Sequence, residues 1–186
     1  MVKTLSRMIP LGTIAPEFEL LEPGSGEIKG LNELRGSSAT VIMFICNHCP
    51  FVKHITSELT SLANDYLSKG IAFIAINSND VDNYPDDSPE NMVKEAKANG
   101  YLFPYLFDET QQVAKAYHAV CTPDFFVFDA NLACVYRGQL DDSRPGNDIA
   151  VSGSDLRAAL NAVISGNSVS DVQKPSVGCN IKWKNS

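Results

Sequence analysis

The sequence of 186 residues lacks the features that mark several broad classes of protein. No run of about 18 consecutive apolar residues occurs, so no segment resembles a membrane-spanning helix. Acidic residues outnumber basic ones by 22 to 15, and the net charge of −7 provides no basic surface for nucleic-acid phosphates or anionic lipids. We therefore expect neither nucleic acid nor a membrane among the partners.

Targeting signals and cysteines are also scarce. The N-terminal segment MVKTLSRMIPLG has no apolar core of about 7–15 residues, which a secretory signal requires. Five cysteines are too few for a disulfide scaffold, and in a reducing compartment such cysteines are catalytic, metal-binding or buried. If the sequence is the full native chain, we expect a cytoplasmic protein.

The length and the apolar patterning predict a single domain. Two runs, ATVIMFI (Ala39–Ile45) and IAFIAIN (Ile71–Asn77), are apolar on both faces, as buried strands are. Between them, apolar residues recur every three or four positions, which predicts an amphipathic helix that ends near Gly70. The remaining predicted elements are a strand at EFELLE, a helix near Glu90–Asn99, a short strand at PYLF, a short helix at Gln111–His118, an antiparallel hairpin of Phe125–Asp129 and Ala133–Gly138, and a helix at Ser154–Ile164.

A parallel β-α-β unit followed by a β-β-α unit is the thioredoxin arrangement. We predict a thioredoxin-like three-layer α/β/α sandwich with an N-terminal β extension (residues 1–38), a core (39–165) and a Gly/Ser/Pro-rich C-terminal tail (166–186).

The motif CNHCP, residues 46–50, lies between the first buried strand and the helix. Helix N-termini carry unpaired N–H groups and partial positive charge, which can lower the pKa of a thiol from about 8.5 to ~3.5–7.5. Pro50 fits the first helical turn, where its missing N–H costs no hydrogen bond. We interpret Cys46 as an exposed nucleophile of low pKa and Cys49 as the resolving cysteine. Their redox-active disulfide would make a separate cofactor unnecessary.

His48 lies between the two cysteines and next to Cys49. Its charge would stabilise the Cys46 thiolate, and thereby the reduced form, so it could set how oxidising the disulfide is. A solvated histidine without this role is the alternative.

A metal site is the main competing interpretation of the two cysteines. Zinc sites that begin with C-x₂₋₄-C need two further ligands, and the sequence has no second CxxC and no HxxxH. The remaining candidates, His54, His118 and Cys121, are loosely spaced. Thiolates also favour Cu(I), but thioredoxin-like copper carriers usually have a longer cysteine spacing. We predict no resident metal, and we keep a non-enzymatic metal-binding or redox-sensing module as an alternative.

Several motifs in chain order resemble a known family. The N-terminal pattern resembles the peroxiredoxin and bacterial thiol–disulfide oxidoreductase branch of the thioredoxin superfamily. Together with the later motifs it resembles peroxiredoxin-like, AhpC/TSA-related thioredoxin-family proteins with a CxxC, over nearly the whole chain. The residues and motifs concerned are Gly12, Ala15-Pro16, Phe18, Leu20, Gly26, Leu31, Leu34, Arg35-Gly36, CNHCPFVKH, CTPDFFVFD, YRGQLDDSRPGN and PSVGCNIKWK.

The resemblance implies a cis-proline that faces the CxxC and shapes the substrate groove. Thr122 and Pro123 come directly before the predicted strand FFVFD, where that proline belongs. An X–Pro bond adopts the cis form at modest cost, so we predict that this bond is cis rather than trans.

The resemblance to peroxiredoxins fails at the positions that bind peroxide. Their pattern is P-x-x-x-T/S-x-x-C; aligned on Cys49 these positions hold Ile42 and Cys46, and aligned on Cys46 they hold Ala39 and Met43. Neither alignment supplies the proline or the hydroxyl. Slow reaction of a low-pKa Cys46 with peroxide stays open.

Further residues are candidates for accessory roles. Topology places the loop with Asp141, Asp142 and Arg144 near the cis-proline, where these side chains could orient a substrate or shift the cysteine pKa values, or could form a salt-bridged surface loop. Cys121, and Cys179 if the tail folds back, could act as a third redox partner, whereas Cys134 should be buried core. Ile181 and Trp183 could hold the tail in place.

The sequence thus predicts an enzyme, a thiol–disulfide oxidoreductase with Cys46 and Cys49 facing Pro123. A peroxide-reducing antioxidant enzyme is the enzymatic alternative. The predicted partners are a disulfide-containing protein or a small thiol or peroxide substrate, and an external thiol reductant.

Overall fold

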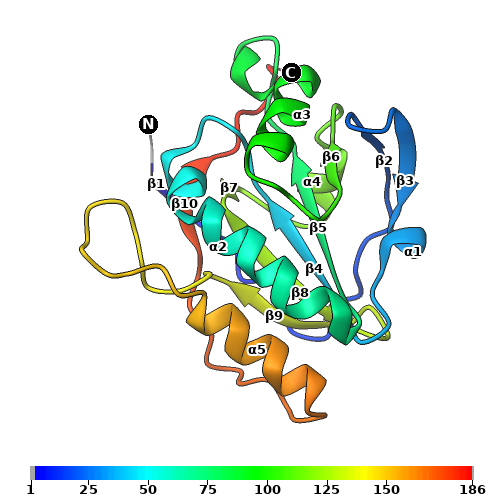
Figure 1. Cartoon of the computed structure of the whole chain (residues 1–186), viewed down its shortest axis with the longest axis vertical. Helices are drawn as coiled ribbons and strands as arrows, with labels where there is room; N and C mark the ends of the chain where they lie inside the picture. The colour runs from blue at the N-terminus through cyan, green and yellow to red at the C-terminus, as the bar shows by residue number, and fades with distance from the viewer. Residues whose placement is uncertain (1–2, 186) are drawn as a thin grey trace.

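The main sheet of the protein has seven strands, and a computed structural model describes residues 3–185 of the chain (Figure 1). The strand order is β3 (Glu27–Gly30), β2 (Glu19–Glu22), β6 (Tyr105–Phe107), β5 (Ile71–Asn77), β4 (Ala39–Phe44), β8 (Asp124–Asp129) and β9 (Cys134–Gly138). β4 and β5 are parallel, whereas β8 runs antiparallel to β4 and forms a hairpin with β9. The predicted buried strands therefore form the centre of the sheet.

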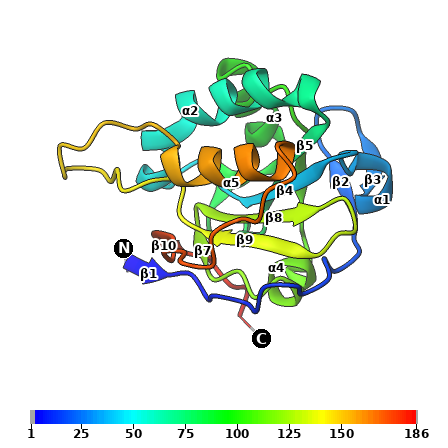
Figure 2. The ribbon, with the colours of Figure 1, turned by 90° about the horizontal axis from the view of Figure 1, so that it is seen from below.

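Helices cover both faces of this sheet (Figure 2). α2 (Pro50–Tyr66), α3 (Pro89–Ala98) and α5 (Ser154–Ile164) pack on one face, and α1 (Leu31–Leu34) and α4 (Gln112–Ala116) pack on the other. Two short 3₁₀ turns, η1 (Leu67–Lys69) and η2 (Pro85–Asp87), lie between elements. The predicted three-layer α/β/α sandwich is confirmed. No helix among residues 3–185 is both long and apolar enough to cross a membrane.

The sequence determines the placement of α2 through simple physical rules. All six residues of β4 are buried, so this strand needs cover on both faces. The buried positions of α2 recur every three or four residues and form one apolar face over the sheet. Pro50 occupies the first turn, and Gly70, with φ +77°, ends the helical segment after η1.

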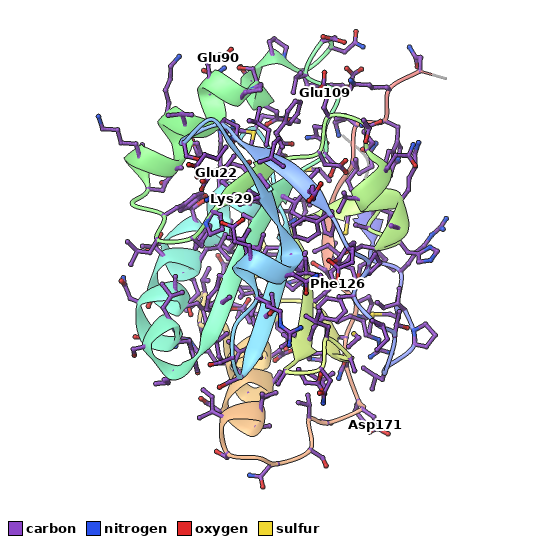
Figure 3. All side chains as sticks on the ribbon, turned by 90° about the vertical axis from the view of Figure 1, so that its right-hand side faces the viewer. Glu22, Lys29, Glu90, Glu109, Phe126 and Asp171 are labelled. Carbon is purple, nitrogen blue, oxygen red and sulfur yellow. The ribbon has the colours of Figure 1, made fainter. Side chains whose placement is uncertain are left out.

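One edge of the main sheet is β3, which forms a hairpin with β2 (Figure 3). Glu22 and Lys29 lie on these two strands, and Lys29 forms ion pairs with Glu27 and Glu33. Charged side chains on an edge strand disfavour pairing with a strand of another chain. Phe126, by contrast, lies on β8 and is fully buried (Figure 3).

A second, three-stranded antiparallel sheet was not predicted. Its order is β1 (Lys3–Leu5), β10 (Val177–Asn180) and β7 (Cys121–Thr122). The predicted tail therefore folds back and supplies the central strand, with Cys179 opposite Thr122. Ile181 is buried as expected of a residue that holds the tail, while Trp183 is partly exposed with Lys115 over its ring.

Candidate active site

The CxxC motif spans the connection from β4 to α2. After β4, the Ile45 N–H donates to Ile76 O at 3.0 Å, which continues the alignment with β5. The helix begins at Pro50, and Cys49 is its N-cap residue with extended backbone. The helix therefore starts after Cys49, and the N–H groups of its first turn lie near Cys49 rather than Cys46.

Both cysteines of the motif are buried thiols. Cys46 is 2% exposed and Cys49 is fully buried. The prediction of an exposed Cys46 is therefore wrong. The reason is the cover around it: Asn47 and Asp87 are themselves buried beside it, and Thr122 contacts its sulfur, with Oγ1 at 3.4 Å.

Cys49 lies at the centre of a cluster of three sulfur atoms. Its Sγ lies 2.8 Å from Cys179 Sγ and 3.2 Å from Thr122 O, to which the neutral thiol donates. When Cys49 ionises, hydrogen bonds from Cys179 and Cys46, and from the Val52 N–H in the first helical turn, lower its pKa. These bonds outweigh the burial of the sulfur, so the thiolate of the cluster rests on Cys49.

Cys46 behaves in the opposite way. Its hydrogen bond to Cys49, its burial and the nearby charge of Asp87 raise the pKa of Cys46 above its usual value. The predicted low pKa of Cys46 is therefore wrong. The physical reason is that Cys46 is hydrogen-bonded to Cys49, whose thiolate Cys179 and, to a smaller extent, the Val52 N–H of the helix stabilise.

Asp87, in the η2 turn, organises the polar side of the motif, and sequence analysis missed it. Oδ1 accepts from the backbone N–H groups of Asn47 (2.8 Å) and His48 (3.2 Å). Oδ2 lies 2.6 Å from His48 Nδ1 and accepts from Asn79 Nδ2 at 2.7 Å. Burial alone would raise the pKa of Asp87, but the bonds from His48 and Asn79 outweigh it and lower the pKa. The carboxylate is therefore ionised although it is fully buried.

His48 lies beside the motif, but its partner is Asp87. The hydrogen bond to Asp87 raises the pKa of His48, and its ring stacks on Tyr84 at 5.6 Å. We expected a charge on His48 to stabilise the Cys46 thiolate; in the structure, His48 pairs with the carboxylate of Asp87 instead. No sequence signal connects Asp87 to His48, since DDSPE resembles only a helix start.

A metal could use three side chains of this region. Cys46, His48 and Asp87 bring ligand atoms within 4.8 Å of one another, and no other such group of three occurs among residues 3–185. However, the two Asp87 oxygens already accept four hydrogen bonds, so a cation would have to displace them. The other candidate ligands lie elsewhere: His54 Nε2 is bonded to Ser143 Oγ, and His118 is exposed.

The bond between Thr122 and Pro123 is cis, and these residues lie against the CxxC. Thr122 contacts Cys46 through its hydroxyl and Cys49 through its carbonyl. Pro123 lines a small cleft together with Phe51 and Arg144. The loop after β9 therefore lies beside the proline, as its topology predicted.

The charged residues of that loop are held by other groups of the loop and, in the case of Asp142, by the tail. Asp141 is buried and accepts from the N–H groups of Ser143, Ser152 and Gly153. Arg144 donates to Asp141 O and Ser143 O at 2.6 and 2.7 Å. Asp142 forms a solvent-exposed ion pair with Lys174 at 2.7 Å. None of these side chains is a principal cause of the pKa shifts at Cys46 or Cys49.

The other cysteines differ in position. Cys121 precedes Thr122 on β7, and successive residues of a strand face opposite sides, so it points away from the face that carries Cys179. Burial raises the pKa of Cys121, and its thiol approaches Pro123 O at 3.8 Å. Cys134 lies in the core on the far face of the main sheet. Only Cys179 joins the motif.

Comparisons with known proteins identify the family of the chain and similar structures. A model of the AhpC/TSA family matches residues 11–137, and no curated protein matches the sequence. An uncharacterized conserved protein from Geobacillus kaustophilus is 60% identical over 100% of this chain and 98% of its own, with a TM-score of 0.98. A hypothetical protein from Sinorhizobium meliloti 1021 is 49% identical over 98% of this chain and 100% of its own, with a TM-score of 0.96.

A more distant structure bears on the fold. A putative thiol:disulfide interchange protein from Chlorobium tepidum, DsbE, is 19% identical over 84% of this chain and 99% of its own, with a TM-score of 0.67. This similarity confirms the thioredoxin-like fold and carries no statement about substrates. The family match ends inside β9, so α5 and β10 lie beyond it.

Proposed function

Because the chain belongs to the AhpC/TSA family, we propose that it is a thiol–disulfide oxidoreductase whose reactive dithiol is Cys46 and Cys49. The observation that carries the proposal is the hydrogen-bonded pair of thiols, in which the pKa of Cys49 is lowered and Thr122 contacts both sulfur atoms. A dithiol with one stabilised thiolate is what exchange with a disulfide requires.

Cys46 is the cysteine that attacks the substrate. Asn47 and His48, which follow it, line an open polar hollow of about 400 Å³ together with Lys53 and Lys94, whereas Cys49 is enclosed by protein. The Cys46 thiol passes its proton to the Cys49 thiolate to which it is hydrogen-bonded. Since Cys46 is itself buried, the side chains over it must shift before a substrate disulfide reaches its sulfur.

The exchange then follows in two steps. The Cys46 thiolate attacks one sulfur of the substrate disulfide, and the other substrate sulfur leaves with the electron pair and takes up a proton. Cys49 loses its proton and attacks Cys46, which releases the second substrate thiol and leaves a Cys46–Cys49 disulfide. An external thiol reductant, the predicted second partner, restores the dithiol. A thiolate stabilised at Cys49 favours the reduced protein and makes this disulfide more oxidising.

Peroxide reduction is the second candidate function, and the AhpC/TSA match favours it. The missing proline and hydroxyl of the peroxiredoxin pattern, and the raised pKa of Cys46, weigh against it. An antioxidant role depends on this second candidate. The cytoplasm stays the predicted compartment.

Parallel assays with insulin and with hydrogen peroxide distinguish the two functions. We expect the reduced full-length protein to catalyse reduction of insulin disulfides by dithiothreitol, and Cys46→Ser to abolish it. Cys134→Ser, which removes a buried cysteine of the far core, is the matched control and should retain the activity. Equal insulin rates in wild type and Cys46→Ser would refute the proposal. Peroxide consumption that needs Cys46, without insulin reduction, would establish the peroxidase instead.

A further inference from the structure

The small sheet brings Cys179 into contact with the reactive dithiol. β10 pairs with β7 so that Cys179 lies opposite Thr122, the residue that contacts both cysteines of the CxxC. Gly178 permits this approach, because a Cβ at that position would collide with Thr122 O. The sulfur of Cys179 thereby lies 2.8 Å from that of Cys49.

The distance between the Cys49 and Cys179 sulfur atoms is only slightly longer than a disulfide bond. The sulfurs of a disulfide are about 2.03–2.05 Å apart, so Cys49 and Cys179 need to approach by only ~0.8 Å. Cys179 is 1% exposed and is held by hydrogen-bonded strands on both sides. Because Cys179 is buried in this position, its thiol can react with the sulfur of Cys49 but not with a thiol from solvent.

We propose that Cys179 is a third redox-active cysteine, which exchanges with the Cys46–Cys49 disulfide to form a Cys49–Cys179 disulfide. This inference rests on the proposed function, since the first disulfide is the product of substrate exchange. Cys179 lies beyond residue 137, where the match to the family ends.

The step is an isomerisation that leaves the oxidation state of the protein unchanged. The Cys179 sulfur attacks the Cys49 sulfur, the bond between Cys49 and Cys46 breaks, and its electron pair leaves on Cys46. The proton that Cys179 loses passes to Cys46. One disulfide and one thiol are present before and after the step, so no additional oxidant or reductant is needed.

Oxidation of the CxxC itself favours this attack. In the reduced protein, the interaction with Cys49 is the largest cause that raises the pKa of Cys179, followed by burial. In the Cys46–Cys49 disulfide, Cys49 carries no negative charge, so this cause disappears. Lys182, whose charge lowers the pKa of Cys179, remains.

The formation of the Cys49–Cys179 disulfide returns Cys46 to its reduced form. When the disulfide moves to Cys49 and Cys179, Cys46 is a thiol again, and the residues that follow it, Asn47 and His48, line the polar hollow. The protein then keeps two oxidising equivalents in its interior while Cys46 is able to attack a second substrate disulfide.

Tryptic peptides separate the two disulfides. Cys46 and Cys49 share the peptide of residues 36–53, whereas Cys179 lies in the peptide 158–182, because trypsin does not cleave between Lys174 and Pro175. The reduced protein is oxidised with one equivalent of diamide, quenched in acid, unfolded, treated with N-ethylmaleimide and digested. We expect mass spectrometry to show the 36–53 and 158–182 peptides cross-linked, with one maleimide on Cys46.

Three variants assign the bond. Cys46→Ser should retain the cross-link, Cys49→Ser should lose it, and Cys179→Ser should show only the internal disulfide in 36–53, with Cys46 protected from maleimide. An internal disulfide alone in the wild type, with normal insulin reduction, would overturn the role of Cys179 and leave the proposed function standing. A cross-link without insulin reduction would support the Cys49–Cys179 bond and refute the proposed function. If neither disulfide forms, both fail.

Discussion

Two buried carboxyl groups lie on opposite sides of Cys49, Asp87 on the side of Cys46 and Asp124 on the side of the small sheet, and their pKa values shift in opposite directions. On the side of Cys46, the carboxylate of Asp87 is ionised, because it accepts four hydrogen bonds and pairs with His48. On the side of the small sheet, Asp124 is also fully buried, but neither of its carboxyl oxygens has a hydrogen-bond partner. Burial is the largest cause of the shift, and it raises the pKa of Asp124 well above its usual range.

The comparison of Asp87 with Asp124 shows that burial alone does not determine whether a carboxyl group in this protein is ionised. Donors placed around Asp87 keep it negative, and that charge in turn raises the pKa of Cys46. On the side of the small sheet, the thiol of Cys179 stabilises the Cys49 thiolate, and the charge of Lys182 lowers the pKa of Cys179. The side of Cys46 therefore suits the binding of a substrate, and the side of the small sheet suits a second, internal disulfide.

The largest expected effect is that of removing the carboxylate on the polar side. Asp87→Ala should lower the free energy of unfolding by about 3–5 kcal/mol, the range for breaking a buried charge pair, because His48 and Asn79 lose their acceptor. Asp86→Ala is the matched control, since Asp86 is the exposed neighbour. Urea denaturation at pH 7 measures both. Equal stability of the two variants would show that the Asp87 network does not hold the motif.

A smaller effect of opposite sign is expected for Asp124, on the side of the small sheet. The pKa of Asp124 is raised in the folded protein, so its contribution to stability is present below about pH 3.9, its unfolded value, and is lost as the pH rises toward the folded value. Asp124→Asn cannot ionise, so it removes this pH-dependent loss and should be more stable than the wild type at pH 8. The gain should shrink toward pH 4 in urea denaturation. A variant less stable than wild type at pH 8 would mean that Asp124 has a partner as an anion.

The pH dependence of the His48–Asp87 pair should be weaker still. The pKa of His48 is raised by Asp87, so its contribution is fully present below pH ~6.5 and is lost as the pH rises through the folded value. The side chain is partly open to solvent, and screening limits the effect to at most about 1 kcal/mol. Between pH 5.5 and 8.5, His48→Gln should flatten the stability profile measured in urea. An unchanged slope would show that this pair does not titrate in that interval.

The smallest effect concerns the loop beside Pro123. Asp142 is exposed and pairs with the exposed Lys174, so Asp142→Asn should leave the insulin reduction rate unchanged. A clear loss of rate would return Asp142 to the substrate site that the sequence suggested for it.

The sequence could predict the elements whose signals are local. β4, β5 and α2 follow from uninterrupted apolar runs and from apolar spacing within one segment, and Cys46 and Cys49 could be identified from their place between β4 and α2. The role of Pro123 followed from the family resemblance, which expects a cis-proline directly before the strand that is β8. The small sheet could not be predicted, because β7 has two residues and β10 has four, and their pairing joins distant parts of the chain. Short strands without alternation carry no periodic signal.

The charges in the site could not be predicted from the sequence either, because they depend on contacts between distant parts of the chain. Asp87 acts through hydrogen bonds to backbone N–H groups of residues 47 and 48, which only the folded chain brings to it. The expected low pKa of Cys46 depended on where the helix begins, but the helix starts after Cys49. The largest cause that lowers the pKa of Cys49 is the hydrogen bond from Cys179, which comes from a distant strand. Boundaries of helices are the least certain part of any inference from sequence.

Trapping a mixed disulfide tests the central claim most directly. In Cys49→Ser the resolving thiol is absent, so attack on a disulfide should stop at the mixed disulfide. After reaction with 5,5′-dithiobis(2-nitrobenzoic acid) in the folded state, acid quenching and digestion, we predict the thionitrobenzoate adduct on Cys46 in the peptide 36–53. An adduct found instead on Cys121, Cys134 or Cys179, with Cys46 unmodified, would contradict the assignment of Cys46 as the attacking cysteine.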